Sequence, residues 1–495
     1  MELSIENILL IGSSLLIISI LAGKSSYKFG VPTLVFFVLV GVLAGSEGIG
    51  GVEFDNPRAA QFVGVVALNF ILFSGGLDTH WPTVRPVLWK GVGLSSVGVL
   101  LTALALGGFV HLISGLGIFE SLLLGAIVSS TDAAAVFSIL RSKNIALKRN
   151  LRPLLELESG SNDPMAYFLT IAFTALVMAP DAGVVSLIPF FLQQIVIGVI
   201  AGYGLAVITR FFINKIRLDF EGLYPVLAVG QMFLVFSLTD FIGGNGFLAV
   251  YLCAVYLGNQ ELIHKKTIMR FFDGMAWLMQ IVMFLALGLL VFPSQILPVI
   301  GLGLLVSGFL MFIARPLAVY ITFLPFKMSH REKLYVSWAG LKGAVPIVFA
   351  TYPLLAGVES ANLIFNIVFF VSITSLFVQG PSLVRVSKWL GVALPTEEKI
   401  PHPVDEFLRE RRQTKMIRLL LSPDCETVGE RVVDIDFPND AVIAMIKREG
   451  KYLTPSGYTV LEPLDELVVL VDDDEAILAV LDSLKTQDFQ FERNL

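Results

Sequence analysis

Four oxygen-bearing side chains stand at helical spacing inside one long apolar run of the chain. Glu158 and Asn162 are four residues apart, and so are Ser159 and Asp163. A helix would therefore present all four on adjoining stripes of its surface. Polar and ionisable groups inside an apolar span are costly to bury and indicate function. A cluster of hard oxygen ligands, one of them able to take up a proton, is what alternating binding of a cation and a proton requires.

Asp163 is the residue on which this interpretation depends. Burial in an apolar span favours the protonated carboxyl group, whereas a bound monovalent cation favours the carboxylate. Proton and cation then compete for one group, which is in itself an exchange mechanism. The alternative is a carboxylate that is paired permanently with a lysine and joins two helices. Because Asn162 leaves one titrating acid where two would otherwise stand, we expect exchange of one cation for one proton without net charge movement.

Two further polar stretches interrupt apolar runs, one at residues 129–132 and one at residues 340–346. In the first, Thr131 and Asp132 offer a second set of oxygens for the cation. Alternatively, Asp132 caps the free amide groups of a broken helix. In the second, Lys342 is the natural partner of Glu158, and this pair would hold two helices in register.

Other charged residues suggest simpler roles. Glu156 is expected either to steer cations or to be a solvated charge at a helix end. Arg315, which precedes Pro316, is predicted to extend toward the cytoplasmic interface. The histidines have no metal-ligand spacing, and the sequence has no phosphate-binding glycine loop of the Walker type. We therefore expect transport driven by ion gradients, with no enzymatic activity and no cofactor.

The composition is too apolar for an ordinary soluble protein. Hydrophobic residues make up 55% and charged residues 15% of the 495 residues, and the mean hydropathy is +0.78. Soluble domains carry about 25% charged residues, so most of this chain is expected to lie in lipid. The net charge of −6 reflects an acidic C-terminal region, and no nucleic-acid partner is expected. Cys253 and Cys425 are too few for a disulfide framework.

Long apolar runs are candidates for membrane spans. We predict about thirteen spans, at residues 5–23, 31–49, 59–77, 86–113, 118–140, 152–179, 186–213, 222–241, 245–259, 271–291, 295–324, 333–355 and 361–389. Lysines and arginines gather in every second loop, so the positive-inside rule places the amino terminus outside and the carboxyl terminus in the cytoplasm. The prediction is a multi-pass protein of the cell inner membrane with a periplasmic N-terminus.

The order of the spans suggests internal symmetry. Thirteen spans divide as six, a linker span and six, and an odd linker turns the second six upside down. The fifth span of each half is the interrupted one, and paired interrupted helices indicate a binding site at the middle of the membrane. The predicted fold for residues 1–390 is an all-α polytopic membrane protein with two inverted six-helix repeats and broken helices.

The chain changes character after residue 390. Residues 391–414 are rich in proline and charge and are predicted to be a linker. Residues 415–495 contain short β-branched runs, separated by turn residues and followed by an amphipathic segment, at 416–421, 441–447, 467–471 and 474–484. We predict a small cytoplasmic α+β domain, of a size at which pairing with a second copy is plausible.

Three stretches resemble the signature of the NhaP/NHE-type cation:proton antiporters: Ser129-Ser130-Thr131-Asp132, Glu158-Ser159-Gly160-Ser161-Asn162-Asp163-Pro164 and Trp338-Ala339-Gly340-Leu341-Lys342-Gly343-Ala344-Val345. The membrane part is most similar to the bacterial NhaP-type K⁺/H⁺ branch, also called cell volume regulation protein A. The C-terminal part resembles the RCK-C (TrkA-C) regulatory module, on Tyr452-Leu453-Thr454-Pro455-Ser456-Gly457-Tyr458 and Asp465-Glu466-Leu467.

The resemblance implies roles for the site residues. Asp163 would exchange the cation and the proton, with Asn162 as its partner. Ser159, Thr131 and Asp132 would contribute to the ion site. The implied assembly is a homodimer with a static dimerisation part and a moving core, which contains the broken helices of both halves and carries the ion across the membrane.

Two positions depart from the usual family pattern. Glu158 would pair with the basic residue of the twelfth helix, where this chain has Lys342 instead of the usual arginine. Lysine keeps the charge but loses the planar fork. Sodium exchangers of this type often carry an acid where Ser74 stands, so we expect K⁺, with Na⁺ as the alternative.

The RCK-C resemblance implies a regulatory role for residues 415–495. Such modules dimerise and bind small ligands, including nucleotides in some relatives. The sequence has no glycine fingerprint of a dinucleotide site, so a nucleotide-type regulatory ligand is a hypothesis.

Other functions are compatible with a polytopic membrane protein. A cation channel gated by the C-terminal domain is the main alternative, although the sequence has no segment like a selectivity filter. An organic-anion symporter would share the inverted-repeat plan, but Asp163 and Asp132 would repel an anion. A structural or receptor role would leave the buried acids unexplained.

Overall fold

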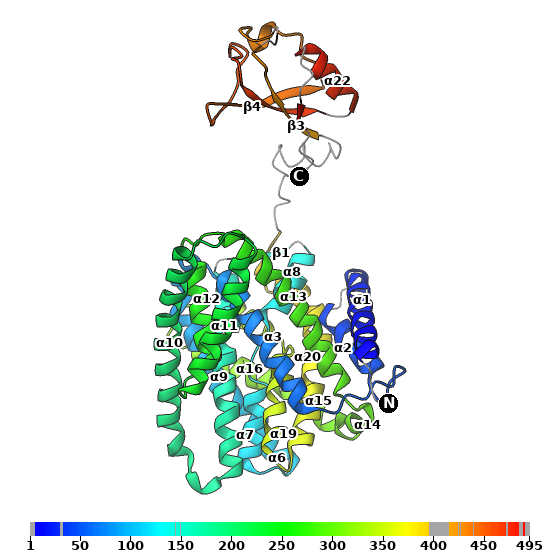
Figure 1. Ribbon diagram of the computed structural model, residues 1–495. Helices are drawn as coiled ribbons and strands as arrows, with labels where there is room; N and C mark the ends of the chain where they lie inside the picture. The colour runs from blue at the N-terminus through cyan, green and yellow to red at the C-terminus, as the bar shows by residue number, and fades with distance from the viewer. Residues whose placement is uncertain are drawn as a thin grey trace. The chain divides into compact units, whose positions relative to one another are not determined.

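The computed structural model describes residues 5–29, 33–143, 145–148, 150–395, 415–423, 425, 427–438, 440–471, 474–484 and 489–490. By its internal contacts the chain divides into two compact units, residues 1–396 and 397–495. The first unit is helical, and the second is built around a β-sheet (Figure 1).

The first half of the helical unit ends with the helix that carries the polar cluster. Its elements, where η denotes a short 3-10 or π-helical stretch, are α1 (Ile5–Phe29), α2 (Thr33–Ala44), α3 (Pro57–Leu77), α4 (Trp81–Val84), η1 (Arg85–Val87), α5 (Leu88–Gly93), η2 (Leu94–Gly98), α6 (Val99–Ser114), α7 (Ile118–Ile127), α8 (Ala133–Ser142) and α9 (Leu151–Met178).

The second half follows a connecting helix. The connection consists of η3 (Pro180–Ala182), η4 (Val184–Ser186) and α10 (Leu187–Lys215). The second half comprises α11 (Leu223–Phe241), α12 (Gly246–Gly258), α13 (Lys265–Leu289), α14 (Pro293–Ile296), η5 (Leu297–Val299), α15 (Ile300–Phe309), η6 (Leu310–Ala314), α16 (Arg315–Thr322), α17 (His330–Trp338), α18 (Val345–Phe349), α19 (Thr351–Ala356) and α20 (Ala361–Trp389).

Many of these segments have the length and apolarity of membrane spans. Among the described residues, seven helical stretches are long and apolar enough to cross a membrane: Pro57–Leu77, Trp81–Ser114, Val184–Lys215, Leu223–Phe241, Lys265–Leu289, Pro293–Thr322 and Ala361–Trp389. Shorter apolar helices and α9 fill the remaining predicted spans. The prediction of an all-α polytopic membrane unit is confirmed.

The two halves pack reciprocally, as inverted repeats do. The second span of each half is short, with 12 residues in α2 and 13 in α12. The third span of each half packs on the second span of the other, α13 on α2 and α3 on α12. Small residues permit both contacts: a Cβ at Gly41 would lie 2.9 Å from the Cα of Gly288, and one at Gly76 would lie 2.6 Å from the Cβ of Ala254. Helices in lipid associate through such residues.

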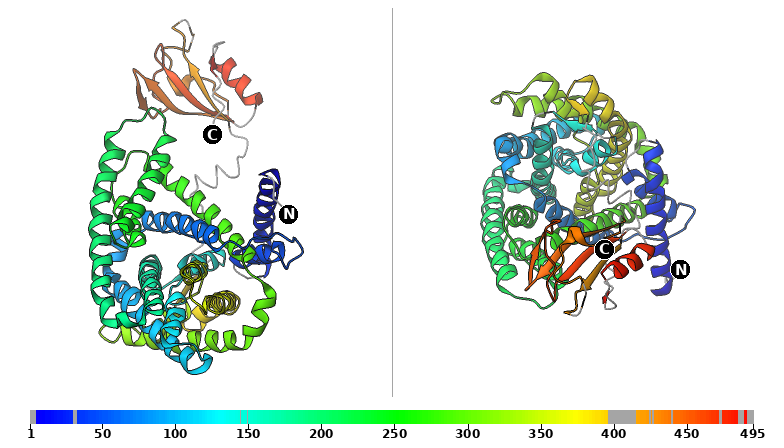
Figure 2. Two further views of the ribbon diagram at one scale, coloured as in Figure 1. Left: turned by 60° about the horizontal axis from the view of Figure 1, so that its bottom comes forward. Right: turned by 90° about the horizontal axis from the view of Figure 1, so that it is seen from above.

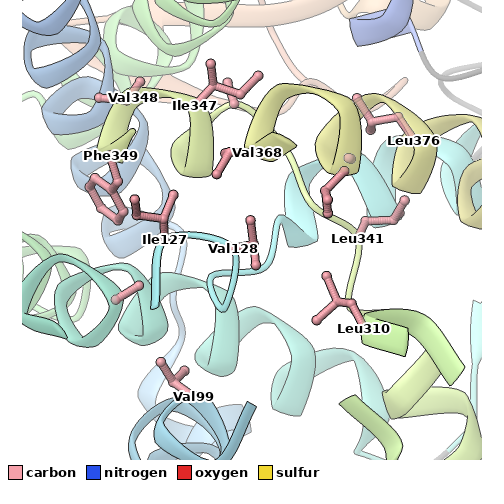
Figure 3. Packing of buried hydrophobic residues seen from close by; sticks show 14 of the residues in the cluster. Val99, Ile127, Val128, Leu310, Leu341, Ile347, Val348, Phe349, Val368 and Leu376 are labelled. Atoms are coloured by element: carbon pink, nitrogen blue, oxygen red, sulfur yellow. The ribbon is translucent and has the colours of Figure 1, made fainter. Parts of the chain in front are cut away.

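The fifth span of each half is interrupted, as predicted. A non-helical stretch separates α7 from α8, and another separates α17 from α18. The two stretches meet, because the backbone N–H of Asp132 donates a hydrogen bond of 2.8 Å to the carbonyl of Leu341. Figure 3 shows Val128 and Leu341, one from each interruption, among the buried side chains of the surrounding helices. The backbone breaks therefore lie inside protein, where they are tolerated.

A short antiparallel ladder joins two distant connections of the helical unit. β1 (Ile145–Leu147) lies between α8 and α9, and β2 (Ala393–Pro395) follows α20. Next to the ladder, the backbone N–H of Lys148 donates to the carbonyl of Val392 at 2.8 Å. The first residues of the predicted linker are thus paired with the helical unit, and residues 396–414 of that linker lie outside the described residues.

The second unit is an α+β fold, as predicted. Its antiparallel sheet has the strand order β5-β4-β6-β3-β7. The elements are β3 (Lys415–Leu420), η7 (Val432–Asp434), β4 (Ala441–Arg448), β5 (Lys451–Leu453), β6 (Glu466–Val471), α22 (Asp474–Ser483) and β7 (Phe489–Gln490). Alternate residues of the strands, including Ile417, Leu419 and Val469, pack with Val480 of α22 in one apolar core.

Two helices mark opposite edges of the helical unit. The views of Figures 1 and 2 agree in placing α10 at one edge and α1 at the other. Only 11% of the most apolar window of Val184–Lys215, which contains α10, is buried. The outer side of α10 is therefore apolar and uncovered within the described part of one chain.

Candidate functional site

The polar cluster lies on α9, as the spacing predicted. The helix continues through Pro164, which supplies no backbone N–H for the helical ladder. Glu158, Asn162 and Asp163 are all buried, with 1%, 0% and 5% of their surfaces exposed. Ser159 is partly exposed. The sequence thus places a strongly polar stripe deep inside an apolar unit.

Asp163 receives a hydrogen bond from the first interruption. The hydroxyl of Ser130, which is fully buried, donates to Oδ1 of Asp163. Hydrogen bonding of this kind stabilises the carboxylate against the cost of burial. Sequence reasoning did not single out Ser130 as a site residue. The available signal was its position in 129–132, the polar stretch that interrupts the fifth span.

Thr131 connects the same interruption to α9. Its hydroxyl oxygen accepts a hydrogen bond of 2.6 Å from Nδ2 of Asn162, and its carbonyl accepts one of 3.0 Å from Ser159 Oγ. The structure therefore brings together Asp163, Asn162, Ser159 and Thr131. Oδ1 of Asn162 is buried and has no hydrogen-bond partner within the described residues.

Asp132 begins the second half of the broken helix. Its Oδ1 accepts a hydrogen bond of 3.0 Å from the backbone N–H of Ala135, which is the capping arrangement at the start of α8. Its carboxylate also lies against Gly343, where an added Cβ would be 2.8 Å from the Cβ of Asp132. Direct coordination of a cation by Asp132 stays a prediction.

Lys342 does not form the predicted ion pair with Glu158. Its ammonium group instead donates to the carbonyl oxygens of Ser129 and Ser130, at 3.1 and 2.9 Å. Those carbonyls are freed where α7 ends, and the C-terminal end of a helix attracts positive charge. The ammonium group of Lys342 is therefore already bound at the broken helix. The backbone N–H of Lys342 donates a hydrogen bond of 2.9 Å to Ser375 Oγ.

Arg315 takes the place that Lys342 was predicted to fill. It is 1% exposed, and its Nη2 donates to Oε1 of Glu158. The prediction that Arg315 extends to the interface is corrected, because the carboxylate of Glu158 offers an unpaired buried partner that its guanidinium can reach. An arginine inside an apolar run was the signal that sequence reasoning undervalued.

The charges around the interruptions follow the helix dipoles. A cation, Lys342, stands at the C-terminal end of α7, and an anion, Asp132, stands at the N-terminal end of α8. Each charge therefore has the sign that stabilises its helix end. Asp163 stands between these two half-helices and is linked to them through Ser130.

A cavity leads from one end of the helical unit to this cluster. Its volume is about 660 Å³, and Asp163, Thr131, Asp132 and Ser159 line its inner part. The outer part is lined by polar and charged residues, namely Asp78, His80, Arg152 and Glu156. Arg152 Nε and Glu156 Oε1 are 2.8 Å apart and form an exposed ion pair. The cavity therefore extends from these charged residues to Asp163.

Aromatic side chains fill the region one turn further along α9. Tyr167, which follows Asp163 by four residues, makes an edge contact with Phe247 at a ring-centroid distance of 5.1 Å and another with Tyr352 at 5.5 Å. Phe349 lies 5.9 Å from Tyr167 and 6.4 Å from Phe247. These rings come from α9, α12, α18 and α19. They pack between the polar cluster of α9 and the C-terminal end of that helix.

Comparisons with known proteins agree with this geometry. The family model "Sodium/hydrogen exchanger, transmembrane" matches residues 13–389, and the model "TrkA-C domain" matches residues 416–482. The K(+)/H(+) antiporter NhaP of Alkalimonas amylolytica is 40% identical over 486 residues, which are 97% of this chain and 84% of the relative. The K(+)/H(+) antiporter NhaP2 of Shewanella sp. (strain ANA-3) is 38% identical over 490 residues, with 98% and 84% coverage.

A solved structure has the same fold. The sodium proton antiporter MjNhaP1 from Methanocaldococcus jannaschii at pH 8 superimposes with a TM-score of 0.68 and 24% sequence identity, over 78% of this chain and 99% of that one. The matches of the family model and of relatives along nearly the whole chain place it in a known group. This protein belongs to the sodium/hydrogen exchanger family of transmembrane monovalent cation/proton antiporters and carries a TrkA-C domain at its C-terminal end.

Proposed function

We propose that the protein exchanges K⁺ for H⁺ and that Asp163 is the group both ions share. The observation that carries the proposal is the position of Asp163, buried at the inner end of a cavity whose wall also offers oxygens of Thr131, Asp132 and Ser159. In a buried site the neutral acid is favoured until a cation replaces the proton. Arrival of K⁺ then releases H⁺, and the reverse step reloads the carboxyl group.

The choice of K⁺ rests on the relatives. Two curated proteins that are 40% and 38% identical to this chain carry the name K(+)/H(+) antiporter. The lack of an acid at Ser74 is weaker support, because Ser74 Oγ donates to Oδ1 of Asp273 at 3.1 Å. An acid therefore stands beside position 74 even though it comes from another helix.

Electroneutral exchange is supported by Asp163 being, among the described residues, the one acid of the α9 cluster that is not in an ion pair. Asn162 contributes a neutral amide beside Asp163, and its Nδ2 is engaged by Thr131. Glu158 is neutralised by Arg315. One carboxyl group that alternates between a proton and a monovalent cation moves no net charge in a full cycle.

Alternating access by an elevator movement is supported by two features of the helical unit. The cavity that contains Asp163 is lined by the charged residues Arg152 and Glu156 at the start of α9. The aromatic cluster of Tyr167, Phe247, Phe349 and Tyr352 packs one turn further along the same helix. We infer that the part containing both interruptions moves as a body past α1–α3 and α10–α13. The uncovered apolar side of α10 supports a homodimer in which α1–α3 and α10–α13 stay fixed.

The positive-inside rule supports the orientation. The cavity mouth carries Arg152 and lies near the connection that contains Lys143 and Lys148, one of the basic loops. We infer that this end faces the cytoplasm of the cell and that the amino terminus is periplasmic. The cavity would then be open to the inside.

The deciding experiment measures exchange in proteoliposomes. Dissipation of an imposed pH gradient is followed after addition of K⁺, Na⁺ or Li⁺, for the wild type and for Asp163→Asn. We expect K⁺ to collapse the gradient in the wild type and none of the ions to do so in Asp163→Asn. Gly301→Ala, whose added Cβ meets no atom within 4 Å and which leaves the carboxyl group of Asp163 intact, is the control for handling losses. Exchange by Asp163→Asn at the wild-type rate would contradict the proposal.

Flux separates the carrier from a channel. A carrier with one buried acid moves one ion per conformational cycle, whereas a channel needs a continuous pore. We expect K⁺ flux to depend on the opposing proton gradient. K⁺ flux that is independent of pH on both sides would favour the channel.

We also infer that the C-terminal domain regulates exchange through the β1–β2 ladder. β1 precedes α9, which carries Asp163, and β2 begins the segment that leads to the TrkA-C domain. Ala146 and Leu394 are directly opposed in the ladder, and opposed residues are close enough for a disulfide. A pull on β2 would therefore act on the start of the ion-binding helix.

A disulfide tests this route. In the Ala146→Cys, Leu394→Cys variant, oxidation should make the exchange rate independent of removal of residues 415–495. Ala146→Cys alone, oxidised in the same way, should respond to the removal as the wild type does. An oxidised double variant that responds as the wild type does would exclude the ladder as the route.

A nucleotide-type ligand for the TrkA-C domain remains a proposal that rests on the family model for residues 416–482. Equilibrium binding of labelled mononucleotides and cyclic dinucleotides to the full chain tests it. Binding that is lost when residues 415–495 are removed would support it. Equal retention by the intact and the shortened chain would contradict it.

A further inference from the structure

A second cavity lies on another face of the ion-binding helix. Its volume is about 300 Å³, and it is enclosed by α9, α10, α12 and the segment from residue 79 to 96. On α9 its wall includes Ser161, Pro164 and Phe168, whereas Ser159 and Asp163 face the ion cavity. Helical spacing puts these two sets on different faces of α9. Within the described residues of α9 the two cavities therefore share no lining residue, although Thr79 and Tyr251 line both of them.

Most polar side chains in the walls of this cavity are hydrogen-bonded within the protein, although the hydroxyl of Tyr251 has no partner among the described residues. The hydroxyl of Ser161 donates to the carbonyl of Leu157, and that of Ser96 donates to the carbonyl of Val92 at 2.5 Å. Nδ2 of Asn245 donates to the carbonyl of Pro164 at 2.9 Å. Each of these polar groups is turned to the protein backbone. A buried water needs two to four polar partners, and an apolar cavity otherwise stays dry.

The cavity is too large to be a packing defect. Each water occupies about 30 Å³ of the liquid, and this space is about 300 Å³. Protein interiors contain few voids larger than one water molecule. An apolar group that enters this space would make dispersion contacts with the lining atoms. Something apolar and longer than a single side chain is needed to supply those contacts.

The bilayer can reach the cavity from the side. Val92 and Val199 line it from the two opposing segments, and they are 40% and 43% exposed. Both residues lie within stretches that are long and apolar enough to span a membrane. Leu192 and Val196 continue the same exposed apolar surface along α10, with 55% and 52% exposure. Within one copy of the chain, the opening therefore lies at membrane depth, on the flank of α10 next to the segment around Val92.

We propose that this cavity is a lipid site and that one acyl chain of a membrane phospholipid occupies it. The apolar walls, the lateral opening and the size all fit a flexible hydrocarbon chain whose headgroup stays at the membrane surface. The chain enters between α10 and the segment around Val92, and it contacts α9 at Ser161, Pro164 and Phe168. It thus fills the space between the ion-binding helix and the helices α10 and α12.

Photolabelling of the full chain tests the site. The protein is reconstituted in phosphatidylethanolamine and phosphatidylglycerol with a small fraction of a phospholipid that carries a diazirine near the end of one acyl chain. After illumination, labelled residues are mapped by mass spectrometry. We expect label on Leu248 and Leu252, which line the cavity from α12. The ion-exchange proposal is not involved in this readout.

Matched tryptophan substitutions make the test specific. Val199→Trp fills the mouth of the cavity and should lower the labelling of Leu252 by about fivefold or more, because a filled cavity leaves no room for a chain. Val196→Trp adds the same side chain to the exposed face of α10 and should leave this labelling unchanged. Val92→Trp fills the mouth from the other flank and replaces Val199→Trp if that variant fails to fold.

Three results would overturn the proposal. The first is equal labelling of Leu252 in the filled and control variants. The second is label confined to outer residues such as Ile200. The third is a protein–protein photoproduct or chemical cross-link across this mouth, which would assign the opening to a contact between two copies of the chain.

Discussion

The backbone N–H of Asp132 donates a hydrogen bond of 2.8 Å to the carbonyl of Leu341, so the two interrupted helices are joined to each other at their breaks. This bond satisfies two backbone groups that neither helix can satisfy by itself. Lys342 and Asp132 then neutralise the helix ends on either side. The carboxyl group of Asp163, which we propose binds the ion, is positioned by this crossing rather than by α9 alone, since its partner Ser130 belongs to the first break.

Gly343→Ala should disrupt the crossing. The added Cβ would lie 2.8 Å from the Cβ of Asp132, which is closer than real Cβ contacts. Overpacking of this kind costs about 1–3 kcal/mol and displaces the neighbouring backbone, so we expect a lower melting temperature and loss of most exchange. Gly301→Ala on α15, which meets no atom within 4 Å, is the control. Normal exchange by Gly343→Ala would show that the crossing tolerates a change of shape.

Ser130→Ala should move the pH profile of exchange to more alkaline values. The variant loses the hydrogen bond to the ionised form of Asp163, so the proton competes better with the cation. A hydrogen bond to a charged group is worth about 1.5–3 kcal/mol, which corresponds to about one pH unit or more. The rate of K⁺-dependent gradient dissipation, measured across pH, reports the shift.

Ser129→Ala is the matched control for that prediction. The hydroxyl of Ser129 donates to the carbonyl of Ala126 within its own helix end and not to Asp163. Its pH profile should match the wild type. Equal shifts in the two variants would mean that the hydrogen bond from Ser130 does not tune the site.

Arg315→Ala should destabilise the helical unit strongly. It leaves the carboxylate of Glu158 buried without its partner, and breaking a buried pair costs about 3–5 kcal/mol. Glu158→Gln combined with Arg315→Met should recover much of the loss, because it removes both charges. Thermal unfolding in detergent measures the change. Arg152→Ala breaks the exposed pair with Glu156 and should cost less than about 1 kcal/mol.

Asp465→Asn should destabilise the C-terminal unit at neutral pH. Burial by itself would raise the pKa of Asp465, but hydrogen bonds from Arg448 and from the Glu462 amide outweigh it, so the pKa lies below its ordinary value. A lowered pKa contributes stability that is complete above the ordinary value of about 3.9 and is lost as the pH falls through the folded value. We expect a loss of about 2 kcal/mol at neutral pH.

Amide hydrogen exchange of β3 and β6, followed from neutral pH to below about pH 4, measures the stability of the C-terminal unit in the full chain. The difference between Asp465→Asn and the wild type should shrink as the pH falls below about 4. Asp434→Asn, whose carboxylate pairs with Arg431 at the surface, should differ little from the wild type at any pH. A constant difference for Asp465→Asn would contradict ionisation as its cause.

Much of the fold could be predicted from the sequence because the bilayer is a uniform solvent. Long apolar runs have to become helices, since their backbone groups find no water. The strands of the C-terminal unit at 415–420, 441–448 and 466–471 could be predicted as well, because runs of β-branched residues are separated there by turn residues. The interruptions at Ser130 and Leu341 were also visible, as polar and glycine-rich stretches inside apolar runs.

Within the site, the sequence determined which residues of α9 share a face, because Glu158, Asn162 and Asp163 are fixed by helical spacing alone. The identity of the partners was decided only in the tertiary structure. Glu158 has two possible cationic partners, one on a distant helix and one in a distant interruption, and which of them pairs with it depends on how the helices cross. The freed carbonyls of the broken helix α7 bind Lys342, which leaves Arg315 for Glu158. Such a choice depends on distances between segments far apart in the chain, and hydropathy and spacing do not contain them.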